Sequence, residues 1–223
     1  MNDLSKKGLV ELIGTFLLTF IGGAAIINGQ AGLIGVALAH GLTVAIVISA
    51  LGHISGGHIN PAVTIGFLVT RKIDLKEGGI YILSQLVGAV FAAFALKQFV
   101  PGAMNASLGG QSVAPSVDLG AAIGIEFILT FFLVTAIFGT AVDERGTFQS
   151  IAGFGIGLVV TADILAGGPL TGASMNPARS FGPALISGHW DNHLVYWIGP
   201  LLGGTIAALI YDRFIMNNAG KKD

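Results

Sequence analysis

The sequence predicts an all-α membrane protein in which six transmembrane helices and two re-entrant half-helices form an inverted three-span repeat. Three observations lead to this fold class: an apolar composition, six long apolar runs, and an internal repeat with a nearly constant register. We expect residues 1–223 to form one membrane domain, with repeats over about residues 8–100 and 118–216.

The composition indicates that the surroundings of the chain are mostly lipid. Hydrophobic residues make up 53% of it and charged residues only 10%, whereas soluble domains carry about 25% charged residues. The net charge of −1 and the scattered basic residues give no reason to expect nucleic acid as a partner. The chain has no cysteine, so disulfides and thiolate chemistry are excluded, and we expect no cofactor and no metal site.

Six apolar runs supply the spanning helices. A helix needs about 20 mostly apolar residues to cross the hydrocarbon core. Five runs reach that length and the sixth is shorter. The first is followed by further long runs, so we interpret it as a span and not as a cleaved signal peptide. The runs are 8–28, 33–54, 79–99, 119–142, 150–165 (the short one) and 194–216.

Basic residues near the span ends set the orientation, because they favour the cytoplasmic side. With six crossings, all but Lys97 and Arg179 of the 11 basic residues share one side with both termini. We therefore expect a multi-pass protein of the cell (plasma) membrane with both termini in the cytoplasm. The residues on that side are Lys6, Lys7, Arg71, Lys72, Lys76, Arg145, Arg213, Lys221 and Lys222.

Two further apolar stretches, 60–69 and 176–186, are too short to cross the membrane. We interpret them as re-entrant half-helices. Such backbone at membrane depth is tolerated only where protein or a water-filled cavity satisfies its polar groups. These stretches therefore indicate a pore.

The chain repeats itself at offsets of 115 and 116 residues. The segment ELIGTF that begins at Glu11 recurs as EFILTF at Glu126, and SGGHINPA at 55–62 recurs as TGASMNPA at 171–178. Each half holds three spans, so the second half must enter from the opposite side of the membrane. The two half-helices should then meet near the midplane.

These residues resemble the aquaporin, or major intrinsic protein, family from Val10 to Phe214, chiefly through two Asn-Pro-Ala motifs in matching repeats. The residues ILAGGP at 164–169 and GPAL at 182–185 look most like the plant tonoplast intrinsic proteins. The resemblance implies the six-helix channel fold. It also implies a passive channel that is not an enzyme, and a homotetramer with one pore per subunit.

The motifs predict two helix starts, because Asn caps exposed N–H groups and Pro suits the first helical turn. A single Asn-Pro pair indicates only a helix cap, but two Asn-Pro pairs related by the internal repeat favour a shared function. The resemblance implies that both amides donate into the pore and interrupt the chain of water molecules. Two positive helix ends at one midplane also raise the barrier to cations, including protons. The motifs are Asn60-Pro61-Ala62 and Asn176-Pro177-Ala178.

Arg179 directly follows the second motif. A charge inside the membrane costs at least ~2.5 kcal/mol on insertion scales, which indicates function, although an interfacial arginine that reaches water is the alternative. The resemblance implies that Arg179, His40, Ile164 and Ala173 form the narrow filter. Strict water channels of the family usually carry an aromatic residue at the place of His40 and histidine at that of Ile164. We therefore expect passage of water with some ammonia, and exclusion of ions and protons.

Other polar residues within the spans have structural interpretations. The resemblance implies that Glu11 and Glu126 accept hydrogen bonds from loop N–H groups, in preference to a catalytic role. His58 should line the cytoplasmic mouth or else bond loop carbonyls. We interpret Asp163 as a solvated helix end, with orientation of Arg179 as the alternative. Glycines should allow close helix crossings; these are Gly14, Gly66, Gly88, Gly124, Gly182 and Gly203.

Three other functions remain as alternatives. Glycerol facilitators of the family usually carry Asp after the filter arginine and a basic residue four places further on, where this chain has Ser180 and Ala184, and they tend to lack the pair Tyr196-Trp197. An intramembrane serine protease needs a nucleophile with a base in reach, and no Gly-x-Ser-x-Gly motif occurs. A cation channel needs acidic or carbonyl rings, whereas the expected constriction carries a positive charge.

Overall fold

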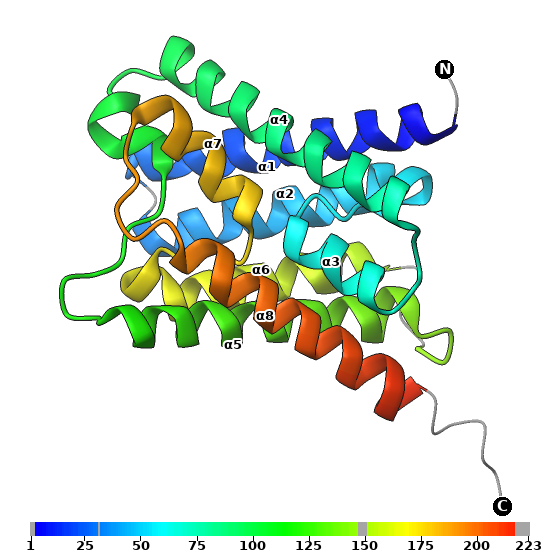
Figure 1. Ribbon diagram of the computed structural model, residues 1–223. Coiled ribbons are helices and arrows are strands. Elements are labelled where there is room, and N and C mark those ends of the chain that lie inside the picture. Colours follow the sequence, from blue (N-terminus) through cyan, green and yellow to red (C-terminus); the bar gives the residue numbers. More distant parts are fainter. Residues whose placement is uncertain (1–2, 31, 147–150, 217–223) are drawn as a thin grey trace, which may run out of the picture.

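The computed structural model describes residues 3–30, 32–146 and 151–216, and these residues form a bundle of helices (Figure 1). Six of the helices are long and apolar enough to cross a membrane, and two short ones lie between them, so the predicted fold class is confirmed. The long helices are α1 Asp3–Asn28, α2 Gly32–Ser55, α4 Leu75–Phe99, α5 Leu119–Ile137, α6 Ala152–Thr171 and α8 Val195–Ile210. The short ones are α3 Pro61–Val69 and α7 Pro177–Ser187.

The helix bounds differ from the expected runs mainly where polar residues extend a helix. The helix α1 begins five residues before the expected run, at Asp3. Asp74 caps α4 by accepting from the Glu77 N–H, which moves its start to Leu75. The expected run 150–165 was too short, because α6 continues through Pro169 to Thr171 and ends at Gly172 in the left-handed region. Ser150, Lys221 and Lys222 lie outside the described residues.

The two half-helices occupy opposite halves of the bundle. Figure 1 shows α3 in one half and α7 in the other, while the start of α1 and the end of α8 lie at the same end of the molecule. The helix α3 packs mainly against α8, and α7 packs mainly against α4. Each half-helix therefore packs mainly against a spanning helix from the other half of the sequence. Both half-helices are enclosed by the long helices.

Glycines bring the long helices into close contact at repeat-related places. A Cβ on Gly88 would lie 2.3 Å from the Leu12 carbonyl oxygen, and one on Gly203 would lie 2.2 Å from the Phe127 carbonyl oxygen. These contacts join α1 to α4 and α5 to α8. The expectation for Gly124 was wrong, because a Cβ there would meet open space.

The C-terminal ends of α5 and α8 are joined by contacts of charged residues. Both helices end in a π-helical turn, Phe138–Val142 and Tyr211–Met216. Arg145 bonds Asp143 through two nitrogens and also donates to the Ile215 carbonyl. The hydrogen bond from Arg145 lowers the pKa of the Asp143 carboxyl to about 2. Lys72, just after α3, forms an ion pair with Asp212 at 3.0 Å.

Candidate functional site

The loops that lead into α3 and α7 meet through their asparagines. Asn60 Nδ2 donates to the Met175 carbonyl at 2.8 Å, and Asn176 Nδ2 donates to the Ile59 carbonyl at 2.9 Å. The side-chain oxygen of each asparagine caps its own half-helix. An amide nitrogen carries two protons, so each asparagine keeps one N–H for a further acceptor. Both asparagines line the same cavity, where that N–H can meet a solute.

Two buried carboxylates hold these loops in the same manner. Glu11 and Glu126 have no exposed surface, and each accepts from two consecutive loop N–H groups. Loop N–H groups at membrane depth have no bulk water to bond, so each carboxylate supplies the acceptors that the loop needs. The bonds are His58 N to Glu11 Oε1 (2.9 Å), Ile59 N to Glu11 Oε2 (2.6 Å), Ser174 N to Glu126 Oε1 (2.9 Å) and Met175 N to Glu126 Oε2 (2.8 Å).

The backbone just before each half-helix turns through the left-handed region. Ile59 has a φ of 45° and its counterpart Met175 a φ of 54°, while Gly57 and its counterpart Ala173 have φ values of 64° and 46°. Non-glycine residues in this region are strained and persist only where the surroundings enforce them. The same strain at corresponding places in both loops is typical of a functional segment.

A cavity of about 40 Å³ lies between the two loops and the surrounding helices. One water molecule needs about 10–15 Å³ on this measure, so the cavity has room for a few. It brings together the predicted residues His40, His58, Asn60, Ile164, Ala173, Asn176 and Arg179. Most of the remaining wall is apolar, from Leu18, Val44, Ile48, Val63, Leu133, Ile137, Ile156 and Val160. Buried Pro61, Ala62, Pro177 and Ala178 form the first helical turns beside it.

Arg179 and His40 form a bonded pair on the cavity wall. Arg179 Nη2 lies 3.2 Å from His40 Nε2, and His40 Nδ1 lies 2.8 Å from the Val36 carbonyl oxygen. Guanidinium only donates and a carbonyl only accepts, so the imidazole must be neutral with its proton on Nδ1. Both ring nitrogens are therefore engaged. Arg179 Nη1 is buried and has no partner among the described residues, which leaves it for a solute.

Gly22 of α1 makes room for the His40 ring. A Cβ at Gly22 would lie 2.2 Å from His40 Nε2. A larger residue there would require the His40 ring to move, which would disturb its bond to Arg179. Glycine is common in this chain, so the sequence offered no signal that singled out Gly22.

Gly22→Ala is expected to separate His40 from Arg179 and to loosen the filter. Overpacking of this kind costs about 1–3 kcal/mol of stability, and leakage of glycerol or urea into proteoliposomes should rise. Gly79→Ala is the matched control, because a Cβ there meets open space. Equal solute leakage in the two variants and in the wild type would show that Gly22 does not shape the filter.

His58 and Asp163 differ in how they relate to the cavity. His58 lines it and bonds Thr64 Oγ1 through Nδ1 at 3.2 Å. The interpretation of Asp163 as a solvated helix end was wrong: its side chain is only 3% exposed, because α6 continues for two more turns beyond it. One of its oxygens has no partner among the described residues, and Arg179 does not bond it there.

Sequence reasoning missed two buried tyrosines that hold the same loops. Tyr81 donates to the Ser55 carbonyl at 2.6 Å, and Tyr196 donates to the Thr171 carbonyl at 2.8 Å. The two tyrosines are 115 residues apart, which is the repeat offset, and this spacing was the signal that could have found them. Gln85 adds a bond to Glu11 Oε2 at 2.7 Å.

Six spanning helices around a cavity, with two half-helices capped at its centre, define a membrane channel. A family model described as "Major intrinsic protein" matches residues 1–211. The chain therefore belongs to the major intrinsic protein family. The predicted family is confirmed, and the chain is a passive channel and not an enzyme.

Curated relatives and a solved structure agree with this assignment. The chain is 46% identical to aquaporin TIP4-4 of Zea mays, with 95% of this chain and 87% of the relative covered. It is 41% identical to the probable aquaporin TIP3-2 of Arabidopsis thaliana, with 96% and 85% covered. The aquaglyceroporin of Plasmodium falciparum superposes with a TM-score of 0.86 at 27% identity, covering 96% of this chain and 98% of that one.

These comparisons bear on the membrane assignment as well. Six apolar helices and the family make the chain a multi-pass integral membrane protein. The similarity to TIP-type aquaporins does not support the expected location in the plasma membrane. The TIP-type relatives support a passive water channel.

Proposed function

We propose that the cavity between the half-helices is the path of water, that it also passes ammonia, and that it excludes ions, protons and most glycerol. The observation that carries this proposal is the filter wall. Ile164 and Ala173 offer no hydrogen bonds, both ring nitrogens of His40 are engaged, and Arg179 Nη1 is the free donor. One unpartnered guanidinium nitrogen on an otherwise apolar filter wall suits a small solute that carries an acceptor.

Positive charge on the cavity wall, from Arg179 and from the N-termini of α3 and α7, accounts for the proposed exclusion of cations and protons. Arg179 is only 2% exposed and sits on the wall, so its positive charge is poorly screened. The N-termini of α3 and α7 add their partial positive charges from the two asparagine caps. Each free asparagine N–H donates to a passing water oxygen, so a water between them cannot pass a proton along the file.

A glycerol facilitator remains the second candidate, because the solved neighbour is an aquaglyceroporin. The residues after the filter arginine argue against it. Ser180 is buried and bonds Gln111 at 2.9 Å, and Ala184 is buried without charge. Trp197 bonds His193 through Nε1 at 3.0 Å, which keeps the aromatic pair in place. If wild-type protein conducts glycerol faster than ammonia, this candidate replaces our proposal.

Ile164→His is expected to reduce ammonia permeability more than water permeability. The imidazole adds bulk and a polar group to the apolar side of the filter and touches neither asparagine. Stopped-flow measurements on proteoliposomes, first with an impermeant osmolyte and then with an ammonium salt, give both rates. Ile164→Val is the control and should retain both. An equal loss of both rates in Ile164→His would argue that Ile164 does not select between the two solutes.

We further propose that residues 1–223 act as one channel domain, that both termini face the cytoplasm and that four copies assemble. The orientation rests on the basic residues at the end of the molecule that holds Lys72 and Arg145. Assembly into four copies rests on the family resemblance alone. The mass of the detergent-solubilised particle tests the number of copies.

A further inference from the structure

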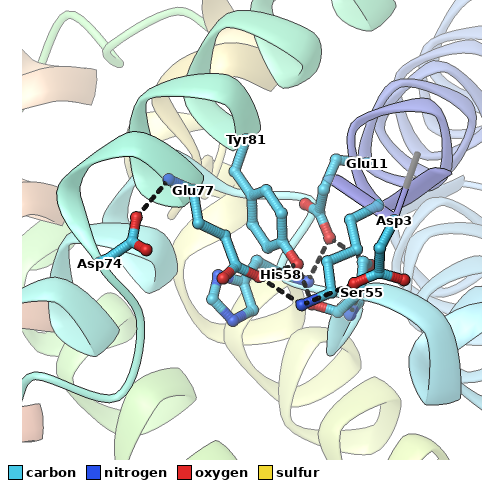
Figure 2. Close-up of polar contacts among 9 residues, drawn as sticks. Asp3, Glu11, Ser55, His58, Asp74, Glu77 and Tyr81 are labelled. Carbon is cyan, nitrogen blue, oxygen red and sulfur yellow. Dashed lines mark hydrogen bonds and ion pairs between the residues drawn. The ribbon is translucent and has the colours of Figure 1, made fainter. Parts of the chain in front are cut away.

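The Tyr81 hydroxyl lies between two acceptors. It is 2.6 Å from the Ser55 carbonyl oxygen and 2.9 Å from Glu77 Oε1. Figure 2 shows Tyr81 with its hydroxyl end near Ser55 and with the Glu77 side chain reaching toward the same place. Lys7 Nζ also donates to Glu77 Oε1, at 3.0 Å. The Tyr81 side chain is fully buried.

The single proton of the Tyr81 hydroxyl faces two acceptors, the Ser55 carbonyl and the Glu77 carboxylate. A phenol carries one proton, a backbone carbonyl only accepts, and an ionised carboxylate only accepts. The Tyr81 proton can therefore satisfy either the Ser55 carbonyl or the Glu77 carboxylate, but not both fully. Glu77 thus weakens the bond from Tyr81 to Ser55. Lys7 opposes this effect, because its ammonium group partly satisfies the same carboxylate oxygen.

The bond from Tyr81 to Ser55 fixes the start of the loop that enters α3. Ser55 Oγ bonds Glu11 at 2.7 Å and accepts from the Gly57 N–H at 3.1 Å, so a shift of Ser55 moves the loop. The Tyr81 ring also packs edge-on against the His58 ring at 5.1 Å between centroids. Tyr81 therefore contacts both the beginning of the loop and the residue of that loop that lines the cavity.

The other half of the molecule has the tyrosine without the competing carboxylate. Tyr196 bonds the Thr171 carbonyl at 2.8 Å, and within the described residues no carboxylate bonds its hydroxyl. The position that corresponds to Glu77 in the repeat register is Asn192. The competition for the proton is thus confined to the cytoplasmic half.

We propose that Glu77 is a positioning residue of the water path, which acts by sharing the Tyr81 proton with the Ser55 carbonyl and so sets how firmly the loop 55–60 is held. The role of Glu77 in water passage rests on the proposed function, in which water crosses through the cavity. Lys7 and Glu77, whose side chains are 27% and 18% exposed, link this loop to the cytoplasmic surface.

Hydrogen exchange in lipid nanodiscs tests the proposal, because it reports local opening of the loop. Glu77→Ala removes the competitor, and Glu77→Gln replaces the charged acceptor with a neutral and weaker one. Both should slow exchange of residues 55–60 by at least about threefold, since a stronger local bond lowers the open population. Residues 171–176 serve as the internal control and should not change. If Glu77 only helped folding through its ion pair with Lys7, both variants would speed exchange.

Repeating the Glu77 substitution in Tyr81→Phe protein, which lacks the hydroxyl, shows whether the effect of Glu77 requires that hydroxyl. In Tyr81→Phe the loop should exchange faster, and adding Glu77→Gln should then have no effect. Faster or unchanged exchange in the single Glu77 variants, or the same slowing in the Tyr81→Phe background, would overturn the proposal. Should Tyr81→Phe fail to fold, the sign of the effect in Glu77→Gln alone decides.

Water permeability of the same variants separates this inference from the proposed function. Glu77→Gln is expected to change water permeability by at least about twofold, in step with loop exchange. Unchanged permeability despite slower exchange would overturn the role of Glu77 in the water path. Absence of any water flux in the wild type would instead overturn the proposed function, and the exchange result would still stand.

Discussion

Arg179→Val is expected to leave the fold intact and to raise glycerol, urea and proton permeability by about tenfold or more, which corresponds to a barrier lowered by ~1.4 kcal/mol. The guanidinium supplies both bulk and charge on the cavity wall. Valine should be tolerated, because Val63 already occupies the corresponding position of α3 and lines the same cavity. Light scattering reports the neutral solutes, and a pH-sensitive dye inside the vesicles reports protons.

Lys97→Gln is the control for loss of a positive charge, because Lys97 is exposed at the end of α4. It should leave all of these permeabilities unchanged. Wild-type solute and proton permeability in folded, reconstituted Arg179→Val protein would remove Arg179 from the filter.

Glu126→Gln is expected to lower yield and thermal stability far more than loss of an exposed carboxylate. Glu126 accepts from the Thr171 hydroxyl and from two loop N–H groups with its two oxygens. The amide offers one acceptor oxygen and turns a donor toward a loop donor. A buried group left unsatisfied costs about 1–3 kcal/mol, so the midpoint of thermal unfolding should fall clearly.

The matched control for this substitution is Glu144→Gln, because Glu144 is exposed after α5. It should unfold at the wild-type temperature. A Glu126→Gln protein with wild-type stability but altered selectivity would mean that the carboxylate acts on the solute and not on the loop.

The spans and half-helices could be predicted because their signals are local. Hydropathy over about 20 residues marks a crossing, and Asn followed by Pro marks a helix start, as at Asn60 and Asn176. The end of α6 could not be predicted in this way. Two glycines and Pro169 argue for a break on local grounds, yet the surrounding helices allow α6 to continue to Thr171.

The partners of buried polar groups were harder to predict, because many of them are backbone atoms. Tyr81 and Tyr196 bond carbonyls, and a carbonyl leaves no trace in the sequence. The sequence placed His40 in the narrow filter, but it did not indicate that its two nitrogens bond the Val36 carbonyl and Arg179. Such pairings depend on the relative rotation of the helices, which hydropathy does not determine.

The central claim is that water crosses through the cavity beside Ile164, and its most direct test is the osmotic shrinkage rate of proteoliposomes in an impermeant osmolyte. Ile164→Trp fills the cavity, whereas Leu165→Trp changes a neighbouring side chain that is 42% exposed on the outside of the bundle. We predict shrinkage well above that of protein-free vesicles for the wild type and Leu165→Trp, and shrinkage at the protein-free rate for Ile164→Trp. Equal rates in Ile164→Trp and the wild type, or a wild-type rate no faster than that of protein-free vesicles, would contradict the claim.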